Sequence, residues 1–152
     1  MNKDQIAFAE AVASAVDIIE VRLLATRAKQ KLVDGQRPKT VRLGRGTNTT
    51  IDRKKNNISV SIRFVLDGAE NESTSWDETP LRIEATFGLS YKVRRMDDFN
   101  DEQMRAFGEI NGAYNAWPFW REFVYSTLAR MGLPPLTLPV FRIEDGDQGT
   151  SD

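Results

Sequence analysis

The side chains able to carry out chemistry in this chain of 152 residues are limited in type. The sequence contains no His and no Cys, which excludes thiolate nucleophiles, disulfides, Ser-His-Asp triads, imidazole acid–base catalysis and the usual zinc ligand sets. Most hydrolase designs are therefore excluded. We expect a protein that is not an enzyme and that needs no metal and no other cofactor.

Carboxylates gather just before the last helical pattern, at Asp97, Asp98, Asp101 and Glu102. Such a group could hold a metal ion or act as a general acid and base. Acidic residues are also favoured in the first turn of a helix, because the helix dipole is positive there. We interpret the four residues as charges that stabilise a helix start.

A basic run, Arg53, Lys54 and Lys55, falls in a predicted turn between two strands. It has no aromatic stacking platform beside it, which single-stranded nucleic acid would need. The chain has 21 basic and 22 acidic residues and a net charge of -1, so it has no overall field that attracts nucleic acid. We interpret the run as a solvated loop and expect no nucleic-acid partner.

Alternation of apolar and polar residues is clearest in 57–67 and again in 81–93, which predicts two strands. The polar, acidic stretch between them predicts a hairpin loop, so the two strands should pair in antiparallel fashion. The Thr-rich stretch 39–57 predicts an irregular strand. Its glycines, Gly44 and Gly46, indicate a bulge or an edge position.

A helical pattern occupies the chain from about 101 to 131, and Gly132 predicts its end. Gly112 and Pro118 predict an interruption or a kink within it. The stretch 2–33 fits both helical spacing and strand alternation, and a short helix followed by a strand is one resolution. No linker divides the chain, which fits one domain. Strands first and helix last predict an α+β fold with helices on one face of an antiparallel sheet.

The helical pattern is rich in aromatic residues. Trp117, Trp120 and Val124 share one face, while Phe119 and Phe123 lie around the helix from it. A helix that is apolar on two sides needs two partners, of which the sheet is one. Large exposed apolar patches are rare on monomers, so a second subunit is favoured over a bound peptide as the other partner. We expect Trp117, Trp120 and Val124 at an oligomer interface.

The helix and the proline-rich segment after it resemble the SecB family of protein-export chaperones. Family members share a Gly-Ala-Tyr or similar turn, an aromatic-Pro step, an Arg-Glu pair, a glycine near the helix end and a PPL-L-P segment, in that order. The matching residues here are Gly112-Ala113-Tyr114, Pro118, Arg121-Glu122, Gly132 and 134–139. The order of elements matches over 16–141 and the specific motifs over about 108–141. The sequence motifs NAWP-WRE and ARMGLPP are closer to those of the SecB-like chaperones of toxin–antitoxin systems.

The resemblance implies a SecB-like α+β fold, a four-stranded antiparallel sheet with a long C-terminal helix packed on one face. Its first strand should be VDIIEVRLLATRAKQ. Residues 1–15 would form an N-terminal helical extension, 16–143 the chaperone domain and 144–152 an acidic flexible tail. Family members carry a second long helix after the proline-rich segment. Only eleven residues follow Phe141 here, so that helix is expected to be missing or vestigial.

The resemblance also implies a function, that of a chaperone (holdase) binding unfolded or nascent polypeptides in apolar grooves. Its setting would be protein export or control of a toxin–antitoxin system, with an antitoxin as partner. The family assembles as a dimer of dimers. Classical members present acidic residues to the motor protein SecA, whereas Arg22 and Arg27 accompany Glu20 here, which puts SecA docking in doubt. The alternative is a specific protein–protein adaptor or a structural subunit without general chaperone activity.

Under this resemblance the proline-rich segment is one wall of the client groove, because Pro134, Pro135 and Pro139 hold it extended. Its wall residues are Leu133, Leu136, Leu138, Val140 and Phe141. Each contributes about 1.5 to 3 kcal/mol if a client buries it fully. The other reading, that the segment covers the domain's own core, stays open. Trp76 either contacts client or packs on the sheet edge.

The N-terminal sequence MNKDQIAFAEAV bears on location. It carries acids at Asp4 and Glu10 and no uninterrupted apolar stretch, so it is not typical of a signal peptide. No apolar run approaches the roughly 18 residues that a membrane helix needs. We expect a cytoplasmic protein without membrane insertion.

Overall fold

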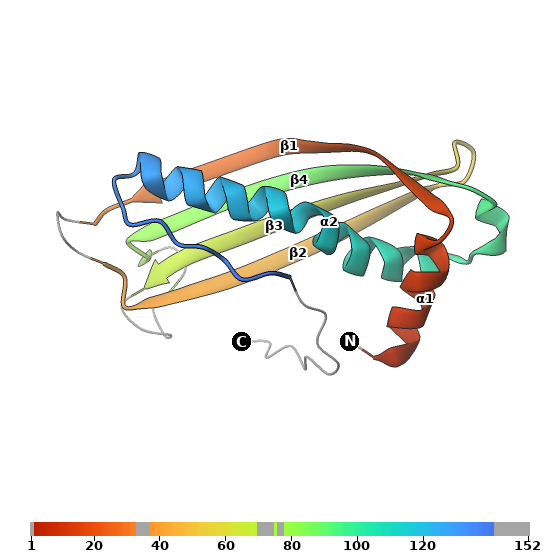
Figure 1. Ribbon diagram of the computed structural model, residues 1–152, viewed down its shortest axis with the longest axis horizontal. Coiled ribbons are helices and arrows are strands. Elements are labelled where there is room, and N and C mark those ends of the chain that lie inside the picture. The colour runs from red at the N-terminus through yellow and green to blue at the C-terminus, as the bar shows by residue number, and fades with distance from the viewer. Residues whose placement is uncertain (1, 33–36, 70–74, 76–77, 142–152) are drawn as a thin grey trace.

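One antiparallel sheet, covered on one face by a long helix, makes up most of the molecule (Figure 1). The computed structural model describes residues 2–32, 37–69, 75 and 78–141. In chain order the elements are α1 (Lys3–Ala13), β1 (Val16–Gln30), β2 (Thr40–Asp52), β3 (Asn57–Ala69), β4 (Leu81–Val93), the short 3-10 helix η2 (Met96–Asp98) and α2 (Asp101–Arg130). The four strands lie in the order β1-β4-β3-β2, so β1 and β2 are the two edges.

The α+β fold expected from the sequence is confirmed, with four antiparallel strands and the long C-terminal helix on one face of the sheet. β1 has the sequence VDIIEVRLLATRAKQ that the resemblance implied. The two glycines of β2 mark an edge strand, and its register with β3 continues without a shift from Thr40 to Asp52. The register shifts lie in β1 instead, between Ile18 and Glu20 and between Leu23 and Ala25.

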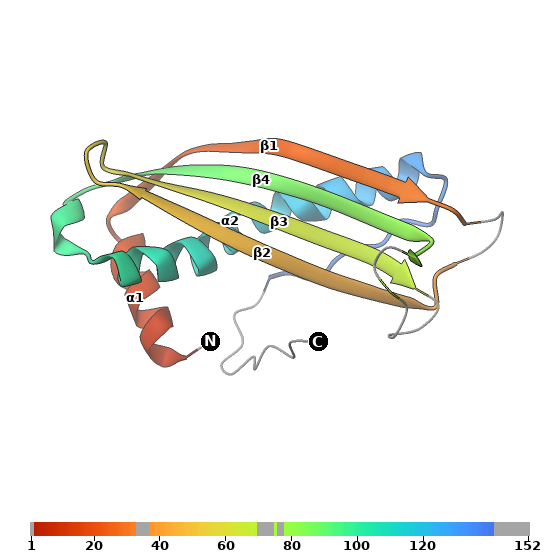
Figure 2. The same ribbon diagram turned by 180° about the vertical axis from the view of Figure 1, so that it is seen from behind.

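The apolar face of the two central strands explains why α2 packs where it does. Every second residue of β4 from Leu81 to Val93 is buried, and so is the matching series of β3 from Ile58 to Leu66. Because side chains alternate across a strand, these residues form one continuous face, which α2 covers. Figure 2 shows the opposite face, with the strands in front and α2 behind them.

The interruption of the last helix expected near Gly112 and Pro118 is wrong, since α2 continues from Asp101 to Arg130 with Pro118 inside it. A proline within a helix removes one hydrogen bond, here the one to the carbonyl of Tyr114. Both residues are exposed, so they lie on the solvent side of the helix.

Two glycines of α2 bring the helix close to the sheet rather than break it. A Cβ added at Gly108 would lie 2.1 Å from Thr49 Oγ1 of β2, and one added at Gly112 would lie 2.8 Å from Val60 Cγ1 of β3. Both distances are far below ordinary contact, so only glycine fits at these positions. The first half of α2 is therefore held directly against β2 and β3.

The N-terminal helix is part of the core. Ala9 and Val12 of α1 are buried and belong to the same apolar cluster as the sheet and α2. Asn2 caps the helix by accepting a hydrogen bond from the backbone of Gln5 at 2.9 Å. The segment expected as an extension thus packs on the domain. The expected acidic tail, 144–152, and Trp76 lie outside the described residues.

Gly108→Ala tests the close approach of α2 to β2. The added methyl would lie 2.1 Å from Thr49 Oγ1 and 3.0 Å from Thr49 Cβ, so rotating the threonine cannot clear it. Overpacking costs about 1 to 3 kcal/mol, whereas Ala in place of Gly gains at most about 1 kcal/mol of helix propensity. We expect a lower free energy of unfolding in urea, partly recovered when Thr49→Ala is added. A single variant more stable than the parent would contradict the close approach.

Candidate functional site

Residues 133–141, here called the strap, run beside α2 on the helix-covered side of the sheet (Figure 1). The strap is neither helix nor strand. It is joined to α2 at its start by a hydrogen bond from the Leu133 N–H to the Leu128 carbonyl at 3.0 Å. Near its end, Trp117 Nε1 donates to the Pro139 carbonyl at 2.7 Å. An extended apolar segment thus already lies on this side of the sheet.

Aromatic rings fix the end of the strap to the sheet. The Trp117 ring lies between Phe64 of β3 and Phe141 of the strap, at centroid distances of 5.8 and 5.5 Å. The Arg45 guanidinium of β2 lies over the Phe141 ring, 4.8 Å from its centroid. Cation–π contacts of this kind contribute about 0.5 to 1 kcal/mol at exposed sites. The ring of Phe141 is therefore held between α2 and β2.

The structure divides the five expected wall residues of the strap. Leu138 is 3% exposed and belongs to the core, so its assignment to a client wall is wrong for this conformation. Leu133, Leu136 and Phe141 are half-buried and pack against the core. Val140 is 56% exposed. The strap therefore covers the domain's own core with one side and keeps part of its apolar surface accessible on the other.

Two of the three residues expected at an oligomer interface are also core residues. Trp120 is 1% exposed and Val124 0% within the single chain, and Trp120 stacks on Phe64 with ring centroids 5.3 Å apart. They face the sheet, so they have no free surface for a second subunit and this expectation is wrong for them. Trp117 is half-buried and anchors the strap as described above.

Sequence reasoning missed the exposed apolar side chains that both edge strands present beside α2 and the strap. On β2, Val41 and Leu43 are close to half exposed; they pair with Gly68 and Leu66 and so lie on the helix-covered face. On β1, Ile18 and Leu23 are similarly exposed and pair with Tyr91 and Phe87 on that same face. The signal was the alternation within β1 and β2, but alternation does not say whether a helix reaches the edge strands.

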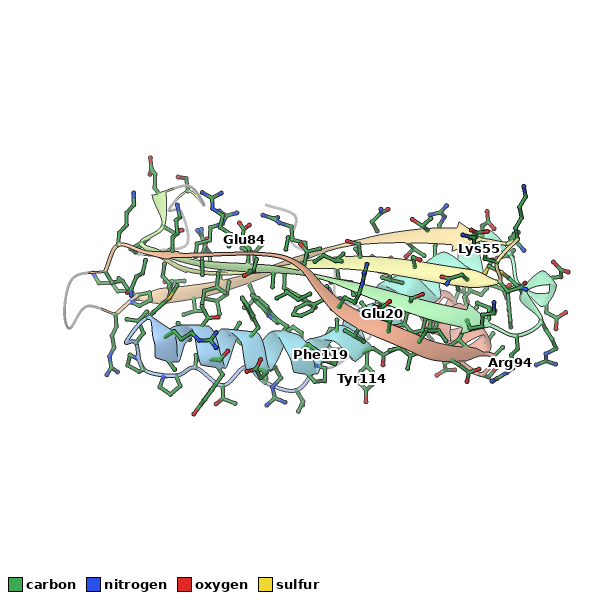
Figure 3. All side chains as sticks on the ribbon, turned by 90° about the horizontal axis from the view of Figure 1, so that it is seen from above. Glu20, Lys55, Glu84, Arg94, Tyr114 and Phe119 are labelled. Carbon is green, nitrogen blue, oxygen red and sulfur yellow. The ribbon has the colours of Figure 1, made fainter. Side chains whose placement is uncertain are left out.

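Phe119 of α2 lies beside the exposed apolar residues of β1. Its ring centroid is 6.3 Å from that of Phe87, the residue opposite Leu23. Figure 3 shows Phe119 and Tyr114 on the α2 side of the sheet. Both are about half exposed. Aromatic surface thus accompanies the exposed leucine and isoleucine of β1.

β1 also presents apolar residues on its other face, at Ile19 and Leu24. The two register shifts of the strand occur at these positions, and extra residues at bulges leave the regular alternation. Leu24 lies across Gly88 of β4, since its Cδ1 would be 2.8 Å from a Cβ added there. β1 is therefore an edge strand with exposed apolar side chains on both faces.

The face of the sheet away from α2 is built from paired charges. Arg42 donates to both carboxylate oxygens of the buried Asp67, at 2.8 and 2.9 Å. Glu84, which Figure 3 shows on this side, accepts from Arg82 and Arg63. Burial opposes the charged form of Glu84, but these two arginines outweigh it and lower its pKa. Apart from Ile19 and Leu24 of β1, this face carries polar pairs in the described residues.

The carboxylate cluster has a structural explanation. Asp101 and Glu102 lie in the first turn of α2, and Asp97 and Asp98 in that of η2, as the helix-start interpretation required. Among the described residues, no group of three or more His, Cys, Asp or Glu side chains could hold a metal ion.

The basic run closes the β2–β3 hairpin, where Arg53 forms an ion pair with Asp101 at 2.7 Å. Lys54 and Lys55 are exposed, which agrees with a solvated loop. An open cavity of about 810 Å³ lies beside this turn and is bordered by residues 48–54 of the hairpin together with Asp101 and Arg105.

Comparisons with known proteins show what this chain is similar to. No protein-family profile matches the chain. Two curated relatives from Mycobacterium tuberculosis match over 91 residues, or 55% of this chain and 50% of each relative: SecB-like chaperone MT2006, 32% identical, and SecB-like chaperone Rv1957, 39% identical. The chain spans about half the length of the curated relatives it matches.

A solved structure matches over more of the chain. It is the Mycobacterium tuberculosis Rv1957 SecB-like chaperone in complex with a ChAD peptide from the Rv1956 HigA1 antitoxin, with a TM-score of 0.76 and 23% identity over 91% of this chain and 99% of that one. The chain has the fold of a SecB-like chaperone. The resemblance found in the sequence is thus confirmed by curated relatives and by the SecB-like fold.

Among the described residues, no helix has both the length and the apolar character that a membrane span requires.

Separate substitutions of Leu138 and Leu136 test the division of the strap into core and accessible residues. Leu138→Ala leaves a cavity in the core and should lower the free energy of unfolding by about 2 kcal/mol or more. Leu136→Ala, at a half-buried position, should lower it by less than half as much. Urea unfolding followed by tryptophan fluorescence measures both. Equal effects of the two changes would contradict the burial difference.

Proposed function

We propose that this protein is a SecB-like molecular chaperone, a holdase that binds non-native polypeptides on apolar surface beside the strap. The observation that carries the proposal is the β2 border, defined here as Val41 and Leu43 of β2 with Val140 and Phe141 of the strap. These side chains are exposed or half-buried, and they lie on the side of the sheet that already holds the strap. Apolar surface gains about 25 cal/mol per Å² when a bound segment removes it from water.

The shape of the β2 border suits extended, unfolded segments. The strap is held by hydrogen bonds near its two ends, by packing of Leu136 and Leu138 on the core, and by prolines that fix its backbone. It therefore keeps Val140 and Phe141 in place beside Val41 and Leu43. Contacts that depend on apolar area and not on specific hydrogen bonds are tolerant of sequence, which a holdase for many clients requires.

The partners we propose are unfolded or nascent polypeptides, with protein export or control of a toxin–antitoxin system as the setting. The likeness to a SecB-like chaperone solved with an antitoxin peptide supports an antitoxin as one partner. The relatives are named as chaperones, and we propose a non-enzymatic role for this chain as well. We further propose a cytoplasmic location, where nascent chains and antitoxins are found.

We propose that the protein is a homo-oligomer that associates through β1. This strand is a sheet edge 15 residues long, and its exposed apolar side chains are Ile18, Ile19, Leu23 and Leu24. Long apolar edges are normally covered, because they otherwise pair with other chains. A symmetric pair of β1 edges would cover part of these side chains on both faces, and the dimer of dimers expected above would then need one further contact.

The alternative function is a specific adaptor, favoured by the observation that the matching solved structure holds a peptide from one named antitoxin. An adaptor would bind one partner tightly and would not protect unrelated proteins. The breadth of clients therefore separates the two functions.

Leu43→Ser together with Val140→Ser should weaken client binding, because the change removes two apolar contacts from the β2 border. We expect the parent to suppress aggregation of at least two unrelated unfolded proteins. The double variant should need a several-fold higher concentration for the same effect. Its melting temperature should change little, because both residues are about half exposed or more.

Thr50→Ser is a matched control, since it is a small change at an exposed position on the other face of β2. The control should behave like the parent. Full suppression by a folded double variant would sink the β2 border as the client site. Protection of a single partner only would favour the adaptor.

Leu23→Glu should separate subunits, because a carboxylate at the centre of β1 cannot be buried without a large cost. We expect light scattering to show the parent as a dimer or tetramer and the variant as a smaller species. A parent that runs only at 17.2 kDa at micromolar concentration would contradict association through β1.

A further inference from the structure

The free edge of β2 offers backbone hydrogen bonds as well as apolar side chains. β2 is the last strand in the order, and no strand of the described residues lies on its outer side. Its register with β3 is unbroken over 13 residues, so the outer edge is equally regular. Unpaired N–H and C=O groups on a regular edge bind another extended backbone.

The usual protections of an edge strand are missing over residues 41–47. Natural edges are protected by Pro, by bulges or by charges that project from the edge, and this stretch has no Pro and no register shift. Its two cations are held over the faces of the sheet: Arg42 binds Asp67 on one side, and Arg45 lies over Phe141 on the other.

Glycines leave room beside this part of the edge. Gly44 and Gly46 lie on the face away from α2, opposite Val65 and Arg63 of β3. A Cβ added at Gly46 would meet no described atom within 4 Å. A segment alongside β2 therefore finds space for a side chain next to Gly46 on that face.

The part of the β2 edge around Thr49 is occupied by contacts with α2. Arg105 Nη1 of α2 donates to the Thr49 carbonyl at 3.2 Å, which occupies one acceptor of the edge strand. Helix and strand also touch there at Gly108. The accessible edge is thus confined to about residues 41–47, which also carry Val41 and Leu43 of the β2 border.

We propose that an extended segment of the client adds to β2 as a fifth strand along residues 41–47. This deepens the proposed function and rests on it. The side chains on one face of the added strand contact the β2 border, and those on the other face lie next to Gly46, where β2 has no side chain. The substrate class is therefore an extended segment of about seven residues, roughly 23 Å long, with apolar residues at alternate positions.

Backbone pairing explains why the occupant is a polypeptide and how binding tolerates many sequences. Every residue except proline carries the same N–H and C=O groups, so hydrogen bonds to the edge do not depend on side-chain identity. The β2 border adds only a requirement for apolar side chains on one face. Segments with proline at the paired positions are excluded, since they lack the N–H.

The test uses a labelled nine-residue peptide with Leu and Val at alternate positions and Ser and Arg between them. Two further forms carry N-methyl groups, one on all apolar positions and one on all polar positions. Successive N–H groups of a strand point to opposite sides, so only one methylated series removes the hydrogen bonds to β2. Sliding the peptide by one residue does not rescue it, because the apolar side chains would then face the wrong way.

We expect the parent peptide to bind and one methylated form to lose at least tenfold in affinity, while the other stays within about threefold. Which form loses binding reports the direction of the added strand. Hydrogen exchange should slow in residues 41–47 when the parent peptide is bound.

Equal affinities of the two methylated forms, or protection confined to β1 or α2, would overturn the added strand. If the peptide binds only by dissociating an oligomer paired through β2, the edge belongs to a second copy and the proposal is also wrong. If the protein suppresses client aggregation but binds no form of the peptide, the proposed function stands and the added strand is wrong. If it neither suppresses aggregation nor binds the peptide, both proposals are wrong.

Discussion

The contact between α2 and the sheet is the constraint on which the rest of the structure depends. Trp120 stacks on Phe64, and the tight fits at Gly108 and Gly112 hold the helix against β2 and β3. One helix cannot cover a sheet of four strands, so apolar residues of both edge strands stay accessible. The strap partly fills one of the two uncovered sides because Trp117 binds it to the same Phe64.

The proposed activity follows from surface that the fold does not cover. A domain that buried all its apolar side chains would have none left for an unfolded client. Here the central strands supply stability through an unbroken buried face, while the edges carry exposed leucine, valine and isoleucine on a rigid support. Over β2, β3 and β4 the opposite face is polar, with Glu84 and Asp67 each paired with arginine. Client binding, as we propose it, is therefore directed to one side of the sheet.

Most of the fold could be predicted from the sequence, because alternation in β3 and β4 and the helical spacing of α2 are local signals. The position of β1 needed the resemblance, since its bulges at Ile18/Glu20 and Leu23/Ala25 blur the alternation. The interruption expected at Pro118 was wrong because the local sequence does not show that this position of the helix is exposed. The core roles of Trp120, Val124 and Leu138 could not be derived either, since periodicity groups residues into faces but does not say which face meets the sheet.

Photo-cross-linking from the β2 border tests the central claim most directly. A photoreactive phenylalanine analogue placed at Leu43, and at Ser59 on the other face of the sheet as a control, would be irradiated with a labelled unfolded protein. Our account predicts strong cross-links from position 43 and few from position 59. Cross-links of equal yield from both positions, or from position 59 alone, would contradict it.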